Sequence, residues 1–182
     1  MSRTAPALLG ALLLLLSLVP NLVSAQENPF QIAFIGPTMQ LVDDDEDVKG
    51  IRLNLPYGVN RNVTGLDLGF INHTNGEFSG VGVGIVNLTE GPFAGWQNGI
   101  VNVAQDRFTG LQFDPIALAN VVGTGEGAQI GWGFNKADYL YGFQLALVNI
   151  AEDMEGLQVG LINIIRSKPT LWILPLVNWK FE

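Results

Sequence analysis

The dominant feature of the chain is an alternation of apolar and small or polar positions that recurs with a fixed period. Each unit reads Gly–apolar–Gln–apolar–Gly–apolar–apolar–Asn, as in GWQNGIVN at 95–102 and GLQVGLIN at 156–163. Alternation with a period of two predicts β-strands, and a constant repeat length predicts an architecture of stacked or consecutive identical units. Most units are 15 residues apart, and they begin at or near Gly50, Gly65, Gly80, Gly95, Gly110, Gly127, Gly142 and Gly156.

The alternation gives each predicted strand two chemically different faces. One face carries large apolar side chains, such as Leu66, Leu68 and Phe70. A helix is excluded because a glycine at every fourth or fifth position would cost about 1 kcal/mol each. The opposite face carries glycine and glutamine, the latter at Gln97, Gln112, Gln129, Gln144 and Gln158.

Short polar stretches separate the predicted strands, for example HTNGE at 73–77 and IAEDM at 150–154. We expect turns there, since dipeptides such as Asn75-Gly76 favour turn conformations. One further strand is predicted before the units at 29–41, broken at Gly36-Pro37, and another after them at 170–181. The total is then about ten strands. Prolines inside strands remove a backbone hydrogen bond, so Pro56 and Pro115 predict bulges, and Pro175 fits less well.

Two architectures are compatible with these strands, and the favoured one is an antiparallel meander of about ten strands closed as a β-barrel. Short turns suit antiparallel neighbours. Strands of roughly ten residues, an even strand number and large apolar side chains on one face are typical of outer-membrane barrels. In that arrangement the apolar face contacts lipid, and the Gly/Gln face fills the inside of a narrow barrel.

The alternative is a parallel β-solenoid in which each unit forms one coil. Constant repeat length with few insertions is typical of solenoids. The large apolar side chains would then point inward, and the asparagines that end the units, such as Asn72, Asn87 and Asn102, would stack as a ladder at a corner. A soluble β-meander is a third possibility.

Composition and charge exclude several classes of protein. The 182 residues include 9 Lys+Arg, 17 Asp+Glu, one His and no Cys, and 48% are hydrophobic. The low charge excludes a disordered chain, and the lack of basic residues argues against a nucleic-acid partner. Without cysteine there is no disulfide, thiol chemistry or lipid-modified cysteine. Residues 1–25 read as a secretory signal peptide, with Arg3, an apolar middle and small residues before a cleavage point at Ala25.

The remaining residues, 26–182, predict a single β-repeat domain. Its units GLQVGLIN, GFQLALVN and GWQNGIVN, the early NPFQIAF segment and the closing LPLVN resemble bacterial surface-repeat proteins known from leptospires. The resemblance covers about residues 28–181 and implies an exported or surface-associated protein whose biochemical role is unknown. It implies no catalytic residues. Many members are lipoproteins, but this chain lacks the cysteine that a lipid anchor needs.

Candidate chemistry is sparse. The acidic run Asp43–Asp47 offers carboxylates to Ca²⁺, although it lacks the spaced ligands of a calcium loop, and a solvated loop is the simpler interpretation. His73, Asp67 and Ser79 can be written as a Ser–His–Asp set, but such sets are defined by geometry, and a turn histidine is the simpler interpretation. We therefore predict no catalytic, cofactor-binding or metal-binding residues.

Two further patterns have simple explanations. Asn62, Asn72 and Asn87 each begin an Asn-x-Thr glycosylation motif, which arises by default because the unit ends in Asn and the turn favours Thr. Four tryptophans could mark a carbohydrate surface, but lipid-interface or core packing is the expected role. They are Trp96, Trp132, Trp172 and Trp179.

The sequence thus predicts a non-enzymatic β-repeat protein of an outer membrane or cell surface, with a structural or interaction role and a lipid bilayer as its partner. The alternative function is an exported soluble binding module, a solenoid that presents its Gly/Gln face to a ligand or partner. A secreted hydrolase is the third class, and it lacks a convincing pair of nucleophile and base.

Overall fold

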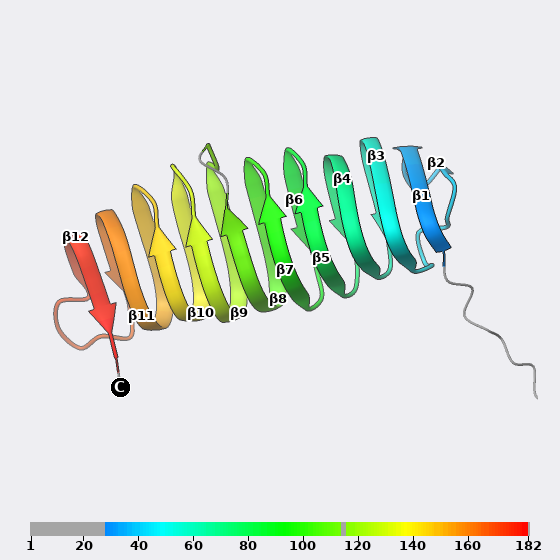
Figure 1. Cartoon of the computed structure of the whole chain (residues 1–182). Coiled ribbons are helices and arrows are strands. Elements are labelled where there is room, and N and C mark those ends of the chain that lie inside the picture. Colours follow the sequence, from blue (N-terminus) through cyan, green and yellow to red (C-terminus); the bar gives the residue numbers. More distant parts are fainter. Residues whose placement is uncertain (1–27, 114–115, 182) are drawn as a thin grey trace, which may run out of the picture.

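The computed structural model describes residues 28–113 and 116–181, which form β-strands joined by turns, with no helix among them (Figure 1). The strands stack side by side along one axis, so the described chain is an elongated array of coils. The strands are β1 (Asn28–Ile35), β2 (Met39–Gln40), β3 (Val48–Asn60), β4 (Val63–Thr74), β5 (Phe78–Val83), β6 (Val86–Thr89), β7 (Phe93–Asn98), β8 (Val101–Phe113), β9 (Ala119–Ile130), β10 (Phe134–Leu145), β11 (Val148–Ile165) and β12 (Ile173–Lys180).

Neighbouring units pair in parallel, and each residue lies beside the residue at the same position in the next unit. Gly65 pairs with Gly80, Gly80 with Gly95, and Asn72 with Asn87. This is a parallel β-solenoid built from repeats of about 15 residues, so the alternative architecture is confirmed and the antiparallel ten-stranded β-barrel is wrong. The predicted turns do not form hairpins, because they return the chain to the start of the next coil.

Each coil consists of two strand segments that face each other. In one coil these are β5 and β6, which are separated by a bend at Gly84 and Ile85. β4 pairs with both of them, because it continues through the corresponding bend as one long strand. The bend was not predicted. Two predicted turns, at 103–107 and 150–154, lie instead within β8 and β11.

The interior between the two segments holds four rows of side chains. Two rows are apolar or small: one contains Phe78, Phe93 and Phe108, whose rings stack with centroids 5.3 and 5.5 Å apart, and the other contains Thr89 and Ala104. The other two rows are polar. They consist of the repeated glutamines Gln97, Gln112, Gln129, Gln144 and Gln158, and of the asparagines Asn72, Asn87, Asn102, Asn120, Asn135, Asn149, Asn163 and Asn178, all at most 2% exposed.

This interior reverses the expectation for a solenoid. The large apolar side chains were predicted to point inward, but Phe70, Val83, Ile85 and Leu161 lie on the outside. The Gly/Gln face was predicted to be presented to a partner, but it lines the core. The asparagine ladder was predicted correctly.

The first glycine of each unit is required by the close stacking of the coils. Gly80 has a φ of +148°, a conformation that L side chains rarely adopt, and a Cβ added there would lie far inside van der Waals contact of the Gly65 carbonyl oxygen. The other unit-starting glycines share this geometry. The repeated glycine is therefore a consequence of backbone approach between coils.

Both ends of the array are closed by the additional strands that the sequence predicts. β1 and β2 precede the units and are separated by a turn that contains Gly36 and Pro37. β12 follows the units and pairs antiparallel with β11, unlike the coils before it. The pairing of β3 with β4 shifts register between Asn54 and Tyr57, which confirms a bulge at Pro56. Pro115 lies outside the described residues.

Candidate functional site: buried amide ladders and an exposed apolar edge

The asparagine row forms a continuous hydrogen-bonded ladder along the solenoid. From Asn54 to Asn163, each side-chain amide nitrogen donates to the amide oxygen of the next asparagine at 2.7 to 2.9 Å. Most of these amides also donate to backbone carbonyls, as Asn72 does to Val83. Because every coil repeats the same geometry, an asparagine side chain in one coil can form a hydrogen bond with the equivalent asparagine in the next coil.

The glutamine row forms a second ladder that runs in the opposite direction. Gln112 donates to Gln97, and each later glutamine donates to the one before it, at 2.6 to 3.0 Å. A ladder of this kind leaves one acceptor without a donor at its end. The two buried side-chain atoms of the described residues that lack a hydrogen-bond partner are Asn54 Oδ1 and Gln158 Oε1, which are the acceptor ends of the two ladders.

The glutamine row is interrupted by a buried ion pair. Arg52 and Asp67 occupy adjacent coils at the glutamine position, and their side chains are 0% and 2% exposed. Arg52 binds Asp67 with two hydrogen bonds of 2.8 and 2.6 Å and also donates to the His73 carbonyl oxygen at 2.8 Å. The next coil has Gly82 at this position, and a cavity of about 10 Å³ lies beside it, the size of one water molecule.

The pairing of Arg52 with Asp67 was not predicted, although the sequence contains a signal for it. The two residues are 15 apart, which equals the repeat, and both replace a glutamine of the unit. Opposite charges at equivalent positions of adjacent coils predict a contact between them.

The structure does not assemble the Ser–His–Asp set. Asp67 points into the core toward Arg52, whereas His73 lies on the outer side of its strand. His73 Nδ1 is 2.9 Å from the Tyr57 hydroxyl, and His73 Nε2 is 2.9 Å from the Glu90 carboxylate. Burial raises the pKa of Tyr57. The histidine therefore links three coils on the surface, with neither Asp67 nor Ser79 as its partner.

The acidic run lies in the connection before β3 and makes local contacts. Asp47 accepts hydrogen bonds from Arg61 at 2.8 Å and from Asn62 at 3.0 Å, and the bond from Arg61 lowers the pKa of Asp47. Among residues 28–113 and 116–181, no group of three or more His, Asp or Glu side chains is placed to hold a metal ion. The run thus supports the first coils through Arg61 and Asn62.

Two of the three glycosylation motifs are inaccessible in the folded chain. Asn72 and Asn87 are 2% exposed, and their amide nitrogens donate within the ladder. Asn62 is partly exposed, but its amide nitrogen donates to Asp47, and its oxygen accepts from the Glu77 backbone. The motifs at Asn72 and Asn87 therefore reflect the repeat, as the sequence suggested.

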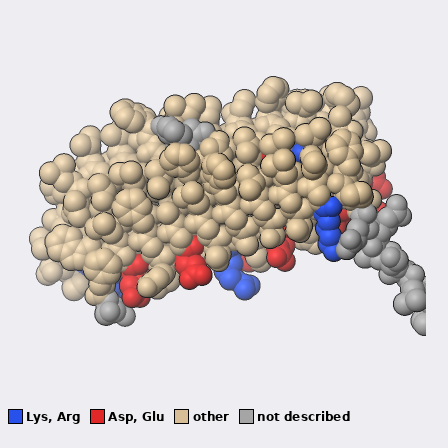
Figure 2. Space-filling view, viewed as in Figure 1, with Lys and Arg blue, Asp and Glu red and all other residues tan. Residues whose placement is uncertain are grey.

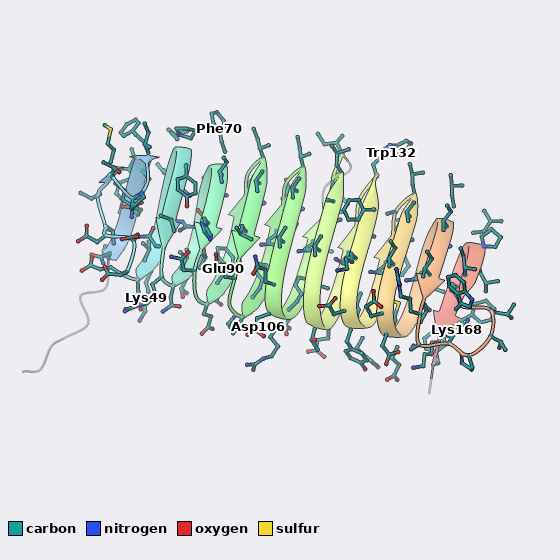
Figure 3. The ribbon with its side chains drawn as sticks, turned by 180° about the vertical axis from the view of Figure 1, so that it is seen from behind. Lys49, Phe70, Glu90, Asp106, Trp132 and Lys168 are labelled. Atoms are coloured by element: carbon teal, nitrogen blue, oxygen red, sulfur yellow. The ribbon has the colours of Figure 1, made fainter. Side chains whose placement is uncertain are left out.

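The outer side of the bends forms a continuous surface that we call the apolar edge. Its large side chains are between 36% and 67% exposed. Figure 3 shows Phe70 and Trp132 projecting from this long edge. The apolar edge consists of Leu55, Phe70, Ile71, Ile85, Ile116, Leu118, Trp132, Phe134, Leu147, Leu161, Ile162 and Leu176. All four tryptophans are at least 38% exposed, so core packing was the wrong expectation for them.

The charged side chains lie away from the apolar edge. In Figure 3, Lys49, Asp106 and Lys168 project from the opposite long edge, and Figure 2 shows most of the visible charged groups along that same side. This separation follows from the repeat, because most of its acids and bases fall between the asparagine of one unit and the glycine that starts the next; Arg52, Asp67 and Asp114 are exceptions. In the described chain from 77 to 168 the acids and bases between asparagine and glycine are Glu77, Glu90, Asp106, Arg107, Glu126, Lys136, Asp138, Glu152, Asp153, Glu155, Arg166 and Lys168.

Two apolar hollows lie on the apolar edge, one toward each end of the solenoid. The first has a volume of about 420 Å³ and is bordered by Leu55, Phe70 and Ile85. The second has a volume of about 530 Å³ and is bordered by Trp132, Leu147, Leu161 and other residues of the last coils. Both volumes are in the range of ligand sites, but neither hollow contains a charged side chain.

Comparison with known proteins gives this chain no relatives. No family model matches it, and no curated protein and no solved structure is similar to it. The resemblance to bacterial surface-repeat proteins therefore stays a prediction. The predicted signal peptide, residues 1–25, lies outside the described residues. Within the described part of the chain, no helix is long and apolar enough to cross a membrane.

Proposed function

We propose that this chain is an exported, non-enzymatic binding module that acts at a cell surface or outer membrane through its apolar edge. The observation that carries the proposal is the separation of apolar from charged side chains over the whole length of the solenoid. Contiguous apolar surface of this extent is unusual on a monomeric protein and marks sites of interaction. The Gly/Gln face has no such role, because its side chains are buried.

The repeat structure supports a binding role over a catalytic one. Each coil adds large apolar side chains to the apolar edge, so the surface extends along the whole solenoid. Many of the polar side chains are used in the ladders or in pairs such as Arg52–Asp67 and His73–Glu90. A surface of this kind suits an extended or planar partner.

The proposal is tested by placing charge on the apolar edge. The double variant Ile85→Asp/Leu147→Asp alters two exposed side chains, and Gln105→Asp/Thr109→Asp adds the same charge at exposed positions outside it. The full-length chain and both variants are expressed in a Gram-negative host, and the cells are fractionated. The purified proteins are analysed by sedimentation equilibrium.

We expect the wild-type chain and the control variant to associate with the envelope or with themselves, and the edge variant to be monomeric in the soluble exported fraction. Equal fractionation and equal mass for all three proteins would show that the apolar edge is not a binding surface, and the proposal would then be wrong.

A further inference from the structure

The proposed binding role leaves open what covers the apolar edge. We infer that its partner is a lipid bilayer. The apolar edge would lie at the boundary between the headgroups and the uncharged acyl chains, with the solenoid axis parallel to the membrane plane. This inference rests on the proposed function and names its partner. Three features of the apolar edge support it: its backbone hydrogen bonding, its charge distribution and its shape.

The backbone of the apolar edge is hydrogen-bonded from coil to coil. Ile162 N donates to the Leu147 carbonyl oxygen at 3.0 Å, Leu147 N to that of Trp132 at 3.1 Å, and Trp132 N to that of Ala117 at 2.9 Å. The same pattern joins Ile85 to Phe70 at 2.9 Å. Lipid offers no hydrogen-bond partners, so a surface that enters it must satisfy its own peptide groups. The peptide groups joined by these bonds meet that condition.

The charge distribution fits an uncharged environment. The stretches at the bends, 68–72, 83–87, 98–102, 131–135, 145–149 and 160–164, contain no charged residue, and the longer connection 113–120 contains one, Asp114. The acids and bases project from the opposite long edge, where they remain in water when the apolar edge is covered. An amphipathic surface of this type lies about 5–10 Å deep at the boundary between headgroups and acyl chains. Because the chain has a formal net charge of −8, anionic headgroups would not attract it.

The shape of the apolar edge favours a fluid partner over a second copy of the chain. The unit that starts at Gly110 is 17 residues from the next one, and its Ile116 and Leu118 side chains are 64% and 56% exposed near the middle of the edge. The hollows of about 420 and 530 Å³ lie on either side of this longer connection. Acyl chains adapt to such relief, whereas two rigid copies would have to interlock along the whole edge.

The test uses the mature full chain and vesicles of phosphatidylcholine, a zwitterionic lipid. We expect the wild-type chain to float with the vesicles at both low and high salt, since no basic patch contributes. Each aspartate on the apolar edge should lower partitioning about tenfold, so Ile85→Asp/Leu147→Asp should lower it about 100-fold. The control Gln105→Asp/Thr109→Asp should partition like the wild type.

The depth to which the apolar edge enters the bilayer is measured separately, so that the test does not depend on the aspartate variants remaining folded. One chain retains only Trp132, and another retains only Trp179, which lies under Lys168 with 5.7 Å between the ammonium and the ring centroid. The other tryptophans are replaced by phenylalanine. Brominated acyl chains should quench Trp132 and leave Trp179 unquenched.

The outcomes separate this inference from the proposed function. Vesicle binding that the aspartate pair abolishes, with Trp132 quenched, supports it. Failure to bind vesicles together with a dimer that the aspartate pair dissociates would overturn the lipid partner and leave a binding role for the apolar edge. Vesicle binding unchanged by the aspartate pair, or quenching of Trp179 in place of Trp132, would also overturn it.

Discussion

The buried pair Arg52–Asp67 offers a sharp test of how the interior is held together. Asp67→Asn removes the negative charge but keeps the side-chain size. Arg52 would then stay in the core as a cation whose remaining acceptors are neutral: the His73 carbonyl oxygen, Asn60 and Thr74. Removing one member of a buried ion pair costs about 3–5 kcal/mol, because the other charge is left uncompensated.

The matched variant replaces both residues by glutamine, the residue that occupies this position in five later coils. Arg52→Gln/Asp67→Gln removes both charges and places two amides in adjacent coils, where they can hydrogen bond as Gln112 and Gln97 do. We expect the double variant to lie within about 1 kcal/mol of the wild type, since replacing a whole buried pair is often neutral. The double variant should then be at least about 2 kcal/mol more stable than Asp67→Asn.

Urea unfolding followed by circular dichroism measures both variants. With an m-value of about 2 kcal/mol/M, Asp67→Asn should lower the midpoint by about 1.5–2.5 M. A separate early transition would indicate that the first coils unfold alone, which repeat proteins allow. A loss below about 1 kcal/mol for Asp67→Asn, or a double variant no more stable than the single one, would refute the reasoning.

Three more predictions concern stability and are checked by urea midpoints. Gly80→Ala should destabilise by about 3 kcal/mol or more because of its positive φ and the Gly65 carbonyl, whereas Gly82→Ala, whose Cβ would make ordinary contacts of 3.4 and 3.5 Å, should be neutral or stabilising by up to about 1 kcal/mol. Gln129→Leu should cost about 2–5 kcal/mol, because it leaves Gln112 Oε1 without its donor and Gln144 Nε2 without its acceptor. Hydrogen bonds from Lys180 and Ser167 lower the pKa of Asp153. The stability that the Asp153 carboxylate adds is therefore present above its ordinary pKa of 3.8 and is lost as the pH falls through the lower pKa of the folded state. Asp153→Asn should be less stable than the wild type near neutral pH and equal to it in strong acid.

Much of the solenoid could be predicted from the repeat. The glycine spacing gave the coil length, the alternation gave strands with two faces, and the repeated asparagine indicated a ladder that the structure confirms. The strand direction was wrong because short turns were taken as hairpins. The bend at Gly84 and Ile85 lets one unit travel out and back, so a short turn at Glu90 can begin the next parallel coil.

The choice of inner face could not be made from alternation, which distinguishes two faces without saying which is buried. Hydrophobicity favours the apolar face for the interior. Exact repetition overrides that preference, because Gln129 and Asn135 meet copies of themselves in the next coils and leave few amide groups unpaired. The two orphan acceptors, Asn54 Oδ1 and Gln158 Oε1, show that the cost of this polar interior is confined to the ends of the ladders.

The core is held by the amide ladders and by apolar rows that include Phe78, Leu140 and Met154, and it does not use the large apolar side chains on the other face of the alternating strands. Those side chains are nevertheless repeated from Phe70 to Leu176 on the outside, where they are exposed. Because most acids and bases lie on the other long edge, the described residues at the bends carry no charged side chain that would resist removal from water. Peptide groups without hydrogen-bond partners would also be costly to place in lipid, and the coil-to-coil hydrogen bonds at the bends reduce this cost. Contact with a partner outside the chain thus explains the apolar edge, and lipid acyl chains are the partner that requires neither charged groups nor hydrogen bonds.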